Sequence, residues 1–286
     1  MSGSLFLVAT PIGNLEDITL RALRVLKDVD LIAAEDTRRT AHLLSHFGIT
    51  TRTTSLHAHN EQRRVPELVA EIAAGLRVAV VTDAGMPGVA DPGYLIVRQA
   101  LDAGIEIQVV PGVSALTMAL AGSGLPSDEF CFLGFAPARS AERRRWVETR
   151  VAPERRTVAI FEAPGRINSL LADLFEILGD RDIVIARELT KVHESWVRGR
   201  LAELTGKDTT ASPERGEFVV LVSAQTSSAS DGPAPTDEDV SACYQRLTVD
   251  AVELSRRDIV RQVAQTFAIP PKTVYAIIER TKSSVE

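Results

Sequence analysis

Short apolar runs alternate with longer helical segments through the first 110 residues, and this alternation limits the possible folds most. Four runs predict buried strands, at Ser4–Ala9, Leu31–Ala34, Arg77–Thr82 and Glu106–Val110. The segments between them predict helices, at Asp17–Val29, Thr37–Phe47, Gln62–Ala74 and Pro92–Ala103, and a glycine follows three of these helices. Strands separated by helices of this length imply βαβ units and a mainly parallel sheet.

A second α/β segment begins near Pro126. Its predicted strands are Phe130–Phe135, Thr157–Phe161, Asp182–Ala186, Ser195–Leu201 and Glu217–Ser223. Helical patterns at Ala141–Arg150 and Arg166–Leu178 lie between the first three of these strands. The later strands follow one another with little helix, so we expect a mixed sheet.

The composition changes at Gln225–Asp239, which is rich in Ser, Pro, Asp and Ala and predicts a flexible linker. Beyond it, short helices are expected at Val240–Arg246, Ser255–Phe267 and Lys272–Arg280, with a capping box at Ser255 and Asp258. The expected domains are therefore residues 1–115 and 116–224, a linker at 225–239, and a small helical appendage at 240–286.

Composition narrows the class of protein. A hydrophobic fraction of 45% and a charged fraction of 24% are ordinary for a soluble globular chain. The two cysteines, Cys131 and Cys243, lie far apart, which disfavours a disulfide scaffold or a cysteine-built zinc site and fits the cytoplasm. No apolar run has the length of a membrane span, and the run from Leu5 to Ala9 is too short for a signal peptide.

The charge is uneven along the chain. A net charge of -6 disfavours a general nucleic-acid binder, yet residues 138–156 hold seven Arg against three Glu. Such a basic stretch allows local contact with RNA, although a solvated helix explains it nearly as well.

Three loops rich in Gly and Pro follow predicted strands: Thr10–Asn14, Asp83–Gly93 and Pro111–Ala115. The carboxyl ends of parallel strands border the ligand crevice of an open sheet, so these loops predict a site built from backbone groups. The sequence contains neither GxGxxG after a strand nor GxxxxGK[ST], so the ligand should need no phosphate cradle. S-adenosylmethionine meets that condition.

Four polar segments lie at predicted strand ends or in loops and have two interpretations each. They are Ala34–Thr40, His57–Glu61, Phe161–Arg166 and Ala186–Lys191. Their acids and bases suit substrate orientation or proton transfer, but equally suit helix N-termini, surface hydrogen bonds or ion pairs. His57 and His59 have no third ligand at a persuasive spacing, so no metal site is expected.

Taken in order, the motifs closely resemble those of the ribosomal RNA small subunit methyltransferase I family, over roughly the first 225 residues. The matching stretches are VATPIGNL from Val8, AEDTR from Ala34, SLHAHNE from Ser55, DAGMPGVADPG from Asp83, PGVSA from Pro111, SGLP from Ser123, EAP from Glu162, RELTK from Arg187 and GEF from Gly216. The resemblance implies an S-adenosylmethionine-dependent cytidine 2′-O-methyltransferase with the tetrapyrrole-methylase fold. It also implies a homodimer that acts on the decoding region of 16S ribosomal RNA in the small ribosomal subunit. The appendage at 240–286 resembles, more loosely, the helix-turn-helix-like appendage of this family, and an RNA contact is expected there.

Carried over by position, the resemblance implies a donor pocket in a cleft between two α/β subdomains. The implied donor-binding residues are Pro11, Ile12, Gly13, Asn14, Asp83, Ala84, Gly85, Met86, Pro87, Val89, Asp91, Pro111, Gly112, Val113, Ser114, Ala115, Phe135, Ala136, Ala163, Arg187 and Glu188. Two positions depart from the family pattern: Met86 stands where threonine is expected, and Gly165 stands where histidine is expected.

For the reaction, the ribose hydroxyl needs in-line orientation and a group that takes its proton. The unranked candidates for this catalytic group are Asp36, His57, Glu61, Glu188 and Lys191; the candidate RNA contacts are Arg38, Arg143, Arg144, Arg145 and Arg187. Two other readings stay open: a tetrapyrrole methyltransferase of the same fold, and a non-enzymatic ligand sensor whose appendage reads DNA.

Overall fold

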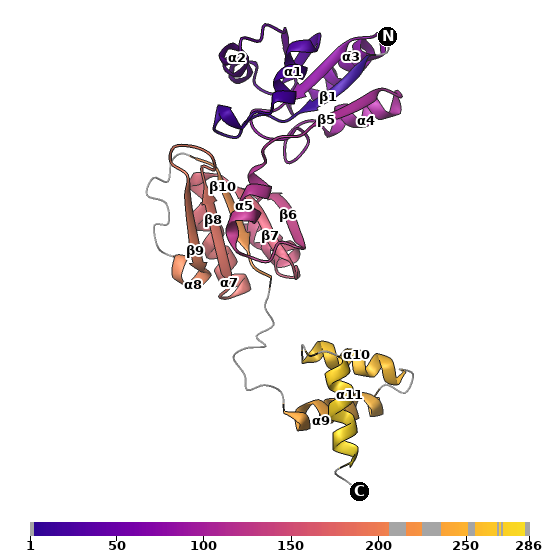
Figure 1. Cartoon of the computed structure of the whole chain (residues 1–286). Coiled ribbons are helices and arrows are strands. Elements are labelled where there is room, and N and C mark those ends of the chain that lie inside the picture. Colours follow the sequence, from indigo (N-terminus) through magenta and orange to yellow (C-terminus); the bar gives the residue numbers. More distant parts are fainter. Residues whose placement is uncertain are drawn as a thin grey trace. The chain divides into compact units, whose positions relative to one another are not determined.

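The computed structural model describes residues 3–205, 216–224, 236–250, 255–267, 269 and 271–283. The chain forms two compact units, Met1–Gln225 and Thr226–Glu286 (Figure 1). Unit 1 contains two five-stranded sheets, and unit 2 contains three helices around their own apolar core. The α/β class with a small helical appendage is confirmed.

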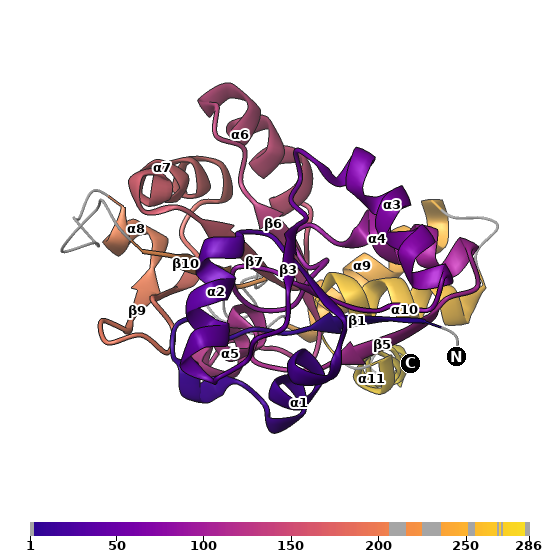
Figure 2. The ribbon, with the colours of Figure 1, turned by 90° about the horizontal axis from the view of Figure 1, so that it is seen from above.

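The first sheet of unit 1 is entirely parallel, as the alternation of strands and helices predicts. Its strand order is β3-β2-β4-β1-β5, and its strands are β1 (Ser4–Val8), β2 (Leu31–Ala34), β3 (Thr53–Ser55), β4 (Arg77–Val81) and β5 (Glu106–Val110). Helices α1 (Leu20–Asp28) and α2 (Thr37–His46) pack on one face, while α3 (Glu61–Ala73) and α4 (Tyr94–Asp102) pack on the other (Figure 2). All the βα loops therefore open at one edge of this sheet.

Local chemistry moves two helix starts away from the predicted positions. Helix α1 begins at Leu20 because the Thr19 hydroxyl caps it, accepting the Ala22 N–H at 3.1 Å, after a short 3-10 turn η1 (Leu15–Asp17). Helix α4 begins at Tyr94 because Gly93 has a φ of 138°, which no helix accommodates.

The second sheet is mixed, as predicted, with the order β6-β7-β10-β8-β9. Its strands are β6 (Phe130–Phe135), β7 (Thr157–Glu162), β8 (Asp182–Arg187), β9 (Ser195–Arg200) and β10 (Phe218–Val222); only β6 and β7 pair in parallel. Alternate residues of β10 enter two different cores. Val220 and Val222 face α7 (Ile167–Leu178), whereas Val219 and Leu221 face α5 (Ala115–Ser123).

The remaining helical segments of unit 1 are short. They are α6 (Ser140–Trp146), the π-helix η2 (Val147–Val151), the 3-10 turn η3 (Pro164–Arg166) and α8 (Leu201–Leu204). The helix predicted over Ala141–Arg150 thus consists of α6 and a π-helical continuation.

Unit 2 consists of α9 (Asp237–Asp250), α10 (Arg256–Thr266) and α11 (Pro271–Ser283). The linker predicted to reach Asp239 ends earlier, because Thr236 and Asp239 form a reciprocal cap that starts α9 at Asp237. Most of that linker, residues 225–235, lies outside the described residues. No helix among the described residues combines the length and apolarity that crossing a membrane requires.

Candidate functional site

The three Gly- and Pro-rich loops meet at the carboxyl edge of the first sheet. Thr10 and Gly85 exchange two backbone hydrogen bonds, at 2.9 and 3.0 Å, and the Thr10 hydroxyl donates to the Thr82 carbonyl at 3.0 Å. The Ala9 N–H donates to the Val110 carbonyl, which joins the first loop to the strand that leads into the third. The loops therefore form one continuous, hydrogen-bonded wall.

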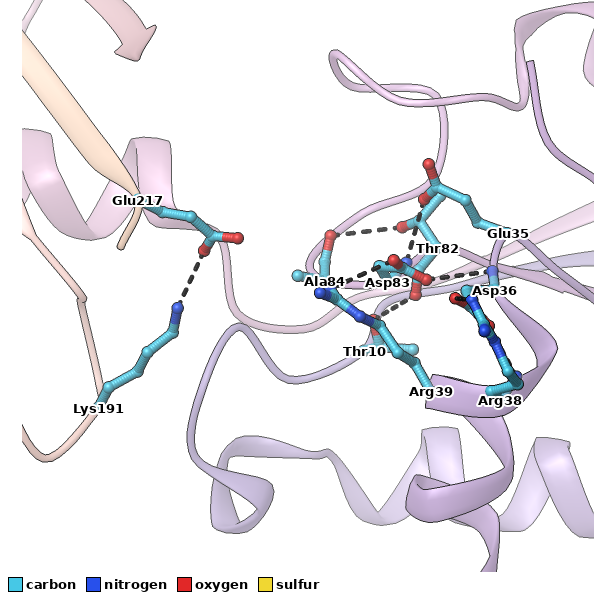
Figure 3. Close-up of polar contacts among 10 residues, drawn as sticks. All are labelled: Thr10, Glu35, Asp36, Arg38, Arg39, Thr82, Asp83, Ala84, Lys191 and Glu217. Carbon is cyan, nitrogen blue, oxygen red and sulfur yellow. Dashed lines mark hydrogen bonds and ion pairs between the residues drawn. The ribbon is translucent and has the colours of Figure 1, made fainter. Parts of the chain in front are cut away.

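An acidic network adjoins this wall at the start of α2 (Figure 3). The Asp83 N–H donates to Glu35 Oε2 at 3.2 Å, and the Asp36 N–H donates to Asp83 Oδ1 at 3.1 Å. Arg39 forms an ion pair with Asp83 at 3.2 Å. The exposed Arg38 lies beside Asp36, and their hydrogen bond holds the pKa of Asp36 at about 2.

A cavity of about 350 Å³ lies against this wall and is closed from the second sheet of unit 1. Its polar lining has one dominant sign, with five carboxylates, Glu35, Asp83, Asp91, Glu162 and Glu217, and one guanidinium, Arg39. Apart from these groups the lining is mainly apolar side chains and loop backbone. This combination suits a ligand with positive charge and an apolar ring, and it repels phosphate.

Aromatic side chains build the wall that the second sheet contributes. Phe161 makes edge contacts with Phe132 at 4.8 Å and with Phe135 at 5.6 Å between ring centroids. Phe161 and Phe135 both line the cavity, and Phe135 keeps 54% of its surface exposed. An apolar ring therefore has a ready stacking surface at the rim.

The loop after β8 crosses to the first Gly-rich loop. Lys191 Nζ lies 2.9 Å from Glu188 Oε1. It also lies 3.2 Å from Glu217 Oε2, the ion pair that Figure 3 shows. Its aliphatic stem covers Gly13, where an added Cβ would come within 2.3 Å of Lys191 Cγ. Glu188 and Thr190 both have positive φ, at 52° and 67°, a conformation that non-glycine residues hold only under tertiary constraint.

The surroundings of two titratable groups near the cavity, Glu162 and Lys191, shift their pKa values upward. Burial raises the pKa of Glu162, although the Ala163 amide and Arg166 oppose it. Burial alone would lower the pKa of Lys191, but its hydrogen bond to Glu188 and the charge of Glu217 raise it. Lys191 is therefore a cation at neutral pH.

About half of the residues implied as donor-binding line the cavity. They are Ile12, Asp83, Ala84, Gly85, Met86, Val89, Asp91, Ser114, Ala115, Phe135 and Ala163. Gly13, Asn14 and Glu188 line a neighbouring hollow with Lys191 instead. The rest, Pro11, Pro87, Pro111, Gly112, Val113, Ala136 and Arg187, line neither space and include the residues that shape the loops.

Three cavity carboxylates are not among the predicted site residues, although two of them lie in the polar segments Ala34–Thr40 and Phe161–Arg166 and each stands in a quoted motif. They are Glu35 in AEDTR, Glu162 in EAP and Glu217 in GEF. In the first motif the predicted candidate is the neighbouring Asp36, but Asp36 caps α2 through the Arg38 N–H, and Glu35 lines the cavity. The motifs mark the strand ends correctly, but they do not tell which side chain turns inward.

None of the five proton-transfer candidates lines the main cavity, and four of their side chains have a structural partner. The exception is His57, whose imidazole Nδ1 is buried without a hydrogen-bond partner among the described residues. Glu61 Oε1 accepts the Gly93 N–H at 3.0 Å, which fixes the end of the long loop 83–93. The His57 N–H donates to Asn60 Oδ1 at 2.8 Å, within the turn that follows β3. Asp36 caps a helix, and Glu188 and Lys191 pair with each other.

The basic stretch after β6 is not a uniform RNA surface. Arg143 is only 5% exposed, and its Nε lies 2.7 Å from Asp173 Oδ2, so it cannot contact RNA. Arg144 pairs with Asp173 and Glu176, which leaves Arg145 as the exposed member of the run. Arg187 lies over the Phe218 ring, at 5.7 Å from its centroid.

Among the described residues, no group of three His, Cys, Asp or Glu side chains has an arrangement that could hold a metal ion. Both cysteines are free thiols.

Comparison with known proteins identifies the family. Residues 4–205 match the model of the Tetrapyrrole (Corrin/Porphyrin) Methylases. The chain is 42% identical over 276 residues to the ribosomal RNA small subunit methyltransferase I of Synechocystis, covering 96% of this chain and 97% of the relative. The Thermotoga maritima protein of the same name is 46% identical over 223 residues, which are 78% of this chain and 99% of that relative. In fold, diphthine synthase aligns with a TM-score of 0.63 at 18% identity, over 78% of this chain and 90% of its own. The chain therefore belongs to the ribosomal RNA small subunit methyltransferase I family of the tetrapyrrole methylases.

Proposed function

We propose that this chain transfers the methyl group of S-adenosylmethionine to the ribose 2′-hydroxyl of a cytidine in 16S ribosomal RNA of the small subunit. The observation that carries the proposal is the cavity lined by five carboxylates and one arginine. The donor has two cationic groups, a sulfonium and an ammonium, and no phosphate. The 42% identity to a full-length relative named for small-subunit rRNA methylation supports the acceptor.

The residues present suit this donor group by group. The carboxylates attract its sulfonium and ammonium, and Phe135 and Phe161 offer an apolar surface for its adenine. The N-terminus of α5, where Ser114 and Ala115 line the cavity, suits the carboxylate of the donor's amino acid part, because a helix N-terminus attracts anions. When bound, the donor supplies an electrophilic methyl carbon, and the protein must supply orientation and an outlet for the hydroxyl proton.

The test is transfer of an isotope-labelled methyl group to three acceptors: small ribosomal subunits, naked 16S RNA and a tetrapyrrole. We expect labelled subunits or RNA, and nuclease digestion should locate the label on the ribose of a cytidine. Label on the tetrapyrrole would instead establish the small-molecule methyltransferase. Donor and nucleic acid binding without any transfer would favour the sensor.

We further propose that RNA approaches along the start of α2, beside the cavity. Arg38 has a side chain that is 88% exposed, and its neighbour Arg39 lines the cavity. Arg145 remains a second candidate contact because it is exposed. Cytoplasmic location and a homodimer accompany this proposal as implications of the family resemblance, and light scattering tests the dimer.

Replacing Arg38 with alanine is expected to weaken RNA binding and reduce the slope of log affinity against log salt by about 0.7–0.9, the share of one phosphate contact. The measurement is RNA binding by fluorescence anisotropy across a salt series. Arg98→Ala is the control, since Arg98 is an exposed arginine of α4, which packs on the opposite face of the first sheet. Equal slopes in both variants would remove Arg38 from the RNA surface.

A further inference from the structure

The cavity carboxylates are not equivalent, because three of the five form an ion pair with a nearby cation. Asp83 pairs with Arg39 at 3.2 Å, and Glu162 pairs with Arg166 at 2.5 Å. Glu217 pairs with Lys191. A carboxylate beside a fixed cation is a poor proton acceptor, because the cation stabilises its charged form.

Two cavity carboxylates have no cation within 4.0 Å among the described residues: Glu35 and Asp91. Glu35 is partly engaged, because its Oε2 accepts the Asp83 N–H. Asp91 has neither a hydrogen bond nor an ion pair with any described residue. Of the five, it alone keeps both oxygens available to a ligand.

The loop that carries Asp91 is built to hold it in place. The Gly88 N–H donates to the Pro92 carbonyl at 3.0 Å, and Ala90 has a positive φ of 63°. Gly93 is anchored through its N–H to Glu61, and an added Cβ on Gly93 would lie 3.0 Å from the Gly88 nitrogen. A strained, cross-tied loop of this kind is typical of a functional position.

The surroundings of Asp91 also favour the uptake of a proton. Burial raises its pKa to about 6, and the negative charges of Glu35, Asp83 and Glu217 add to the rise. Among the described residues that line the same cavity, Arg39 is the one basic side chain, and it is paired with Asp83. A carboxylate with a pKa near the working pH is an effective general base.

The geometry points to Asp91 as the catalytic base, the residue that takes the proton from the ribose 2′-hydroxyl during methyl transfer. The inference rests on the proposed function and adds the group that the proposal left unassigned. It also separates Asp91 from the other donor-loop residues, whose part is binding.

In the transfer step one bond forms, one bond breaks and one proton moves. The hydroxyl oxygen forms a bond to the methyl carbon, and the bond between that carbon and sulfur breaks. Its electron pair returns to sulfur, which turns the sulfonium into a neutral thioether. The hydroxyl proton moves to an Asp91 carboxylate oxygen, so a cation and an anion are both neutralised and no further reagent is needed.

The decisive variant is Asp91→Asn, which keeps the shape of the side chain and removes its basicity. We expect kcat at saturating donor to fall by about 10²–10⁴-fold. The donor Kd from calorimetry should change much less, because the other four cavity carboxylates keep their charge. The wild-type kcat should rise with pH through about 6, and this acid limb should be absent from the residual activity of the variant. A kcat above one tenth of wild type, or an unchanged acid limb, would overturn the inference.

A second variant tests the charge environment. Glu35→Gln removes one of the negative charges that raise the pKa of Asp91, so the acid limb should move to lower pH. If Asp91 had only a structural role, the acid limb of the pH profile would not move. Asp102→Asn, an exposed substitution on α4, is the control and should leave the profile unchanged.

Folding is checked in the same samples. The folded-state pKa of Asp91 lies above its unfolded value, so its charge destabilises the fold as pH rises through about 6. Asp91→Asn should therefore melt at or above the wild-type temperature at pH 8, and a lower Tm there would contradict this environment. Failure of wild type to label ribose would overturn the proposed function, whereas an active wild type with an active Asp91→Asn overturns only this inference.

Discussion

Replacing Asp173 with alanine is expected to lower the free energy of unfolding by about 3–5 kcal/mol. The side chains of Arg143 and Asp173 are only 6% and 9% exposed and lie 2.7 Å apart. Removing the carboxylate leaves a buried guanidinium without its partner, and Arg144 loses a 3.3 Å contact as well. Urea denaturation measures the change.

The matched control is the double substitution Arg143→Met with Asp173→Leu. It replaces both charges by apolar side chains of similar size, so most of the lost stability should return. Donor affinity should be unchanged in both variants at temperatures where they are folded. The pair belongs to the sheet face covered by α7, and the cavity lies on the side where Val219 points. An alanine variant within 1 kcal/mol of wild type would show that the pair adds little to the fold.

Replacing Gly112 with alanine is expected to weaken donor binding and turnover together, with turnover falling on the order of 100-fold. An added Cβ would lie 2.7 Å from the Cβ of Ala9, which is 3% exposed at the end of β1. Since a β-carbon cannot rotate away, the loop from Pro111 must move by about 1 Å, and it carries Ser114 and Ala115 into the cavity wall. Calorimetry and labelled transfer measure the two effects.

The clash itself can be reversed. Ala9→Gly removes the opposing methyl group, so the double variant Ala9→Gly with Gly112→Ala should recover most of the donor affinity. Gly165→Ala is the control, because no atom lies within 4 Å of its added Cβ. A Gly112→Ala protein that binds the donor like wild type would mean that the third loop does not shape the site.

Most of the first sheet was predictable because four of its strands are short apolar runs, and three of its four helices are amphipathic and are followed by a glycine. Two of the elements that were not predicted, β3 and α5, escaped for opposite reasons. β3 has only three residues, Thr53–Ser55, and no apolar run. Helix α5 is apolar on nearly all sides and packs against β10. It therefore lacks the periodic apolar pattern by which a surface helix is recognised in a sequence.

The site was predictable as a set of loops but not as a set of inward side chains. A strand end tells where a crevice opens, while the choice between Glu35 and Asp36 depends on which of them caps α2. The three consecutive arginines from Arg143 show the same limit. Successive helical residues point about 100° apart, so a basic run in the sequence divides between core and solvent.

The negative lining of the cavity has a consequence for selection among cellular adenosine compounds. ATP and the nicotinamide dinucleotides share the adenosine part of the proposed donor, but each brings phosphates toward the carboxylates of this wall. Like charges held together out of water cost several kcal/mol. The protein can thus discriminate among these metabolites by repelling the anionic ones. It needs no higher affinity for the adenine that all of them share.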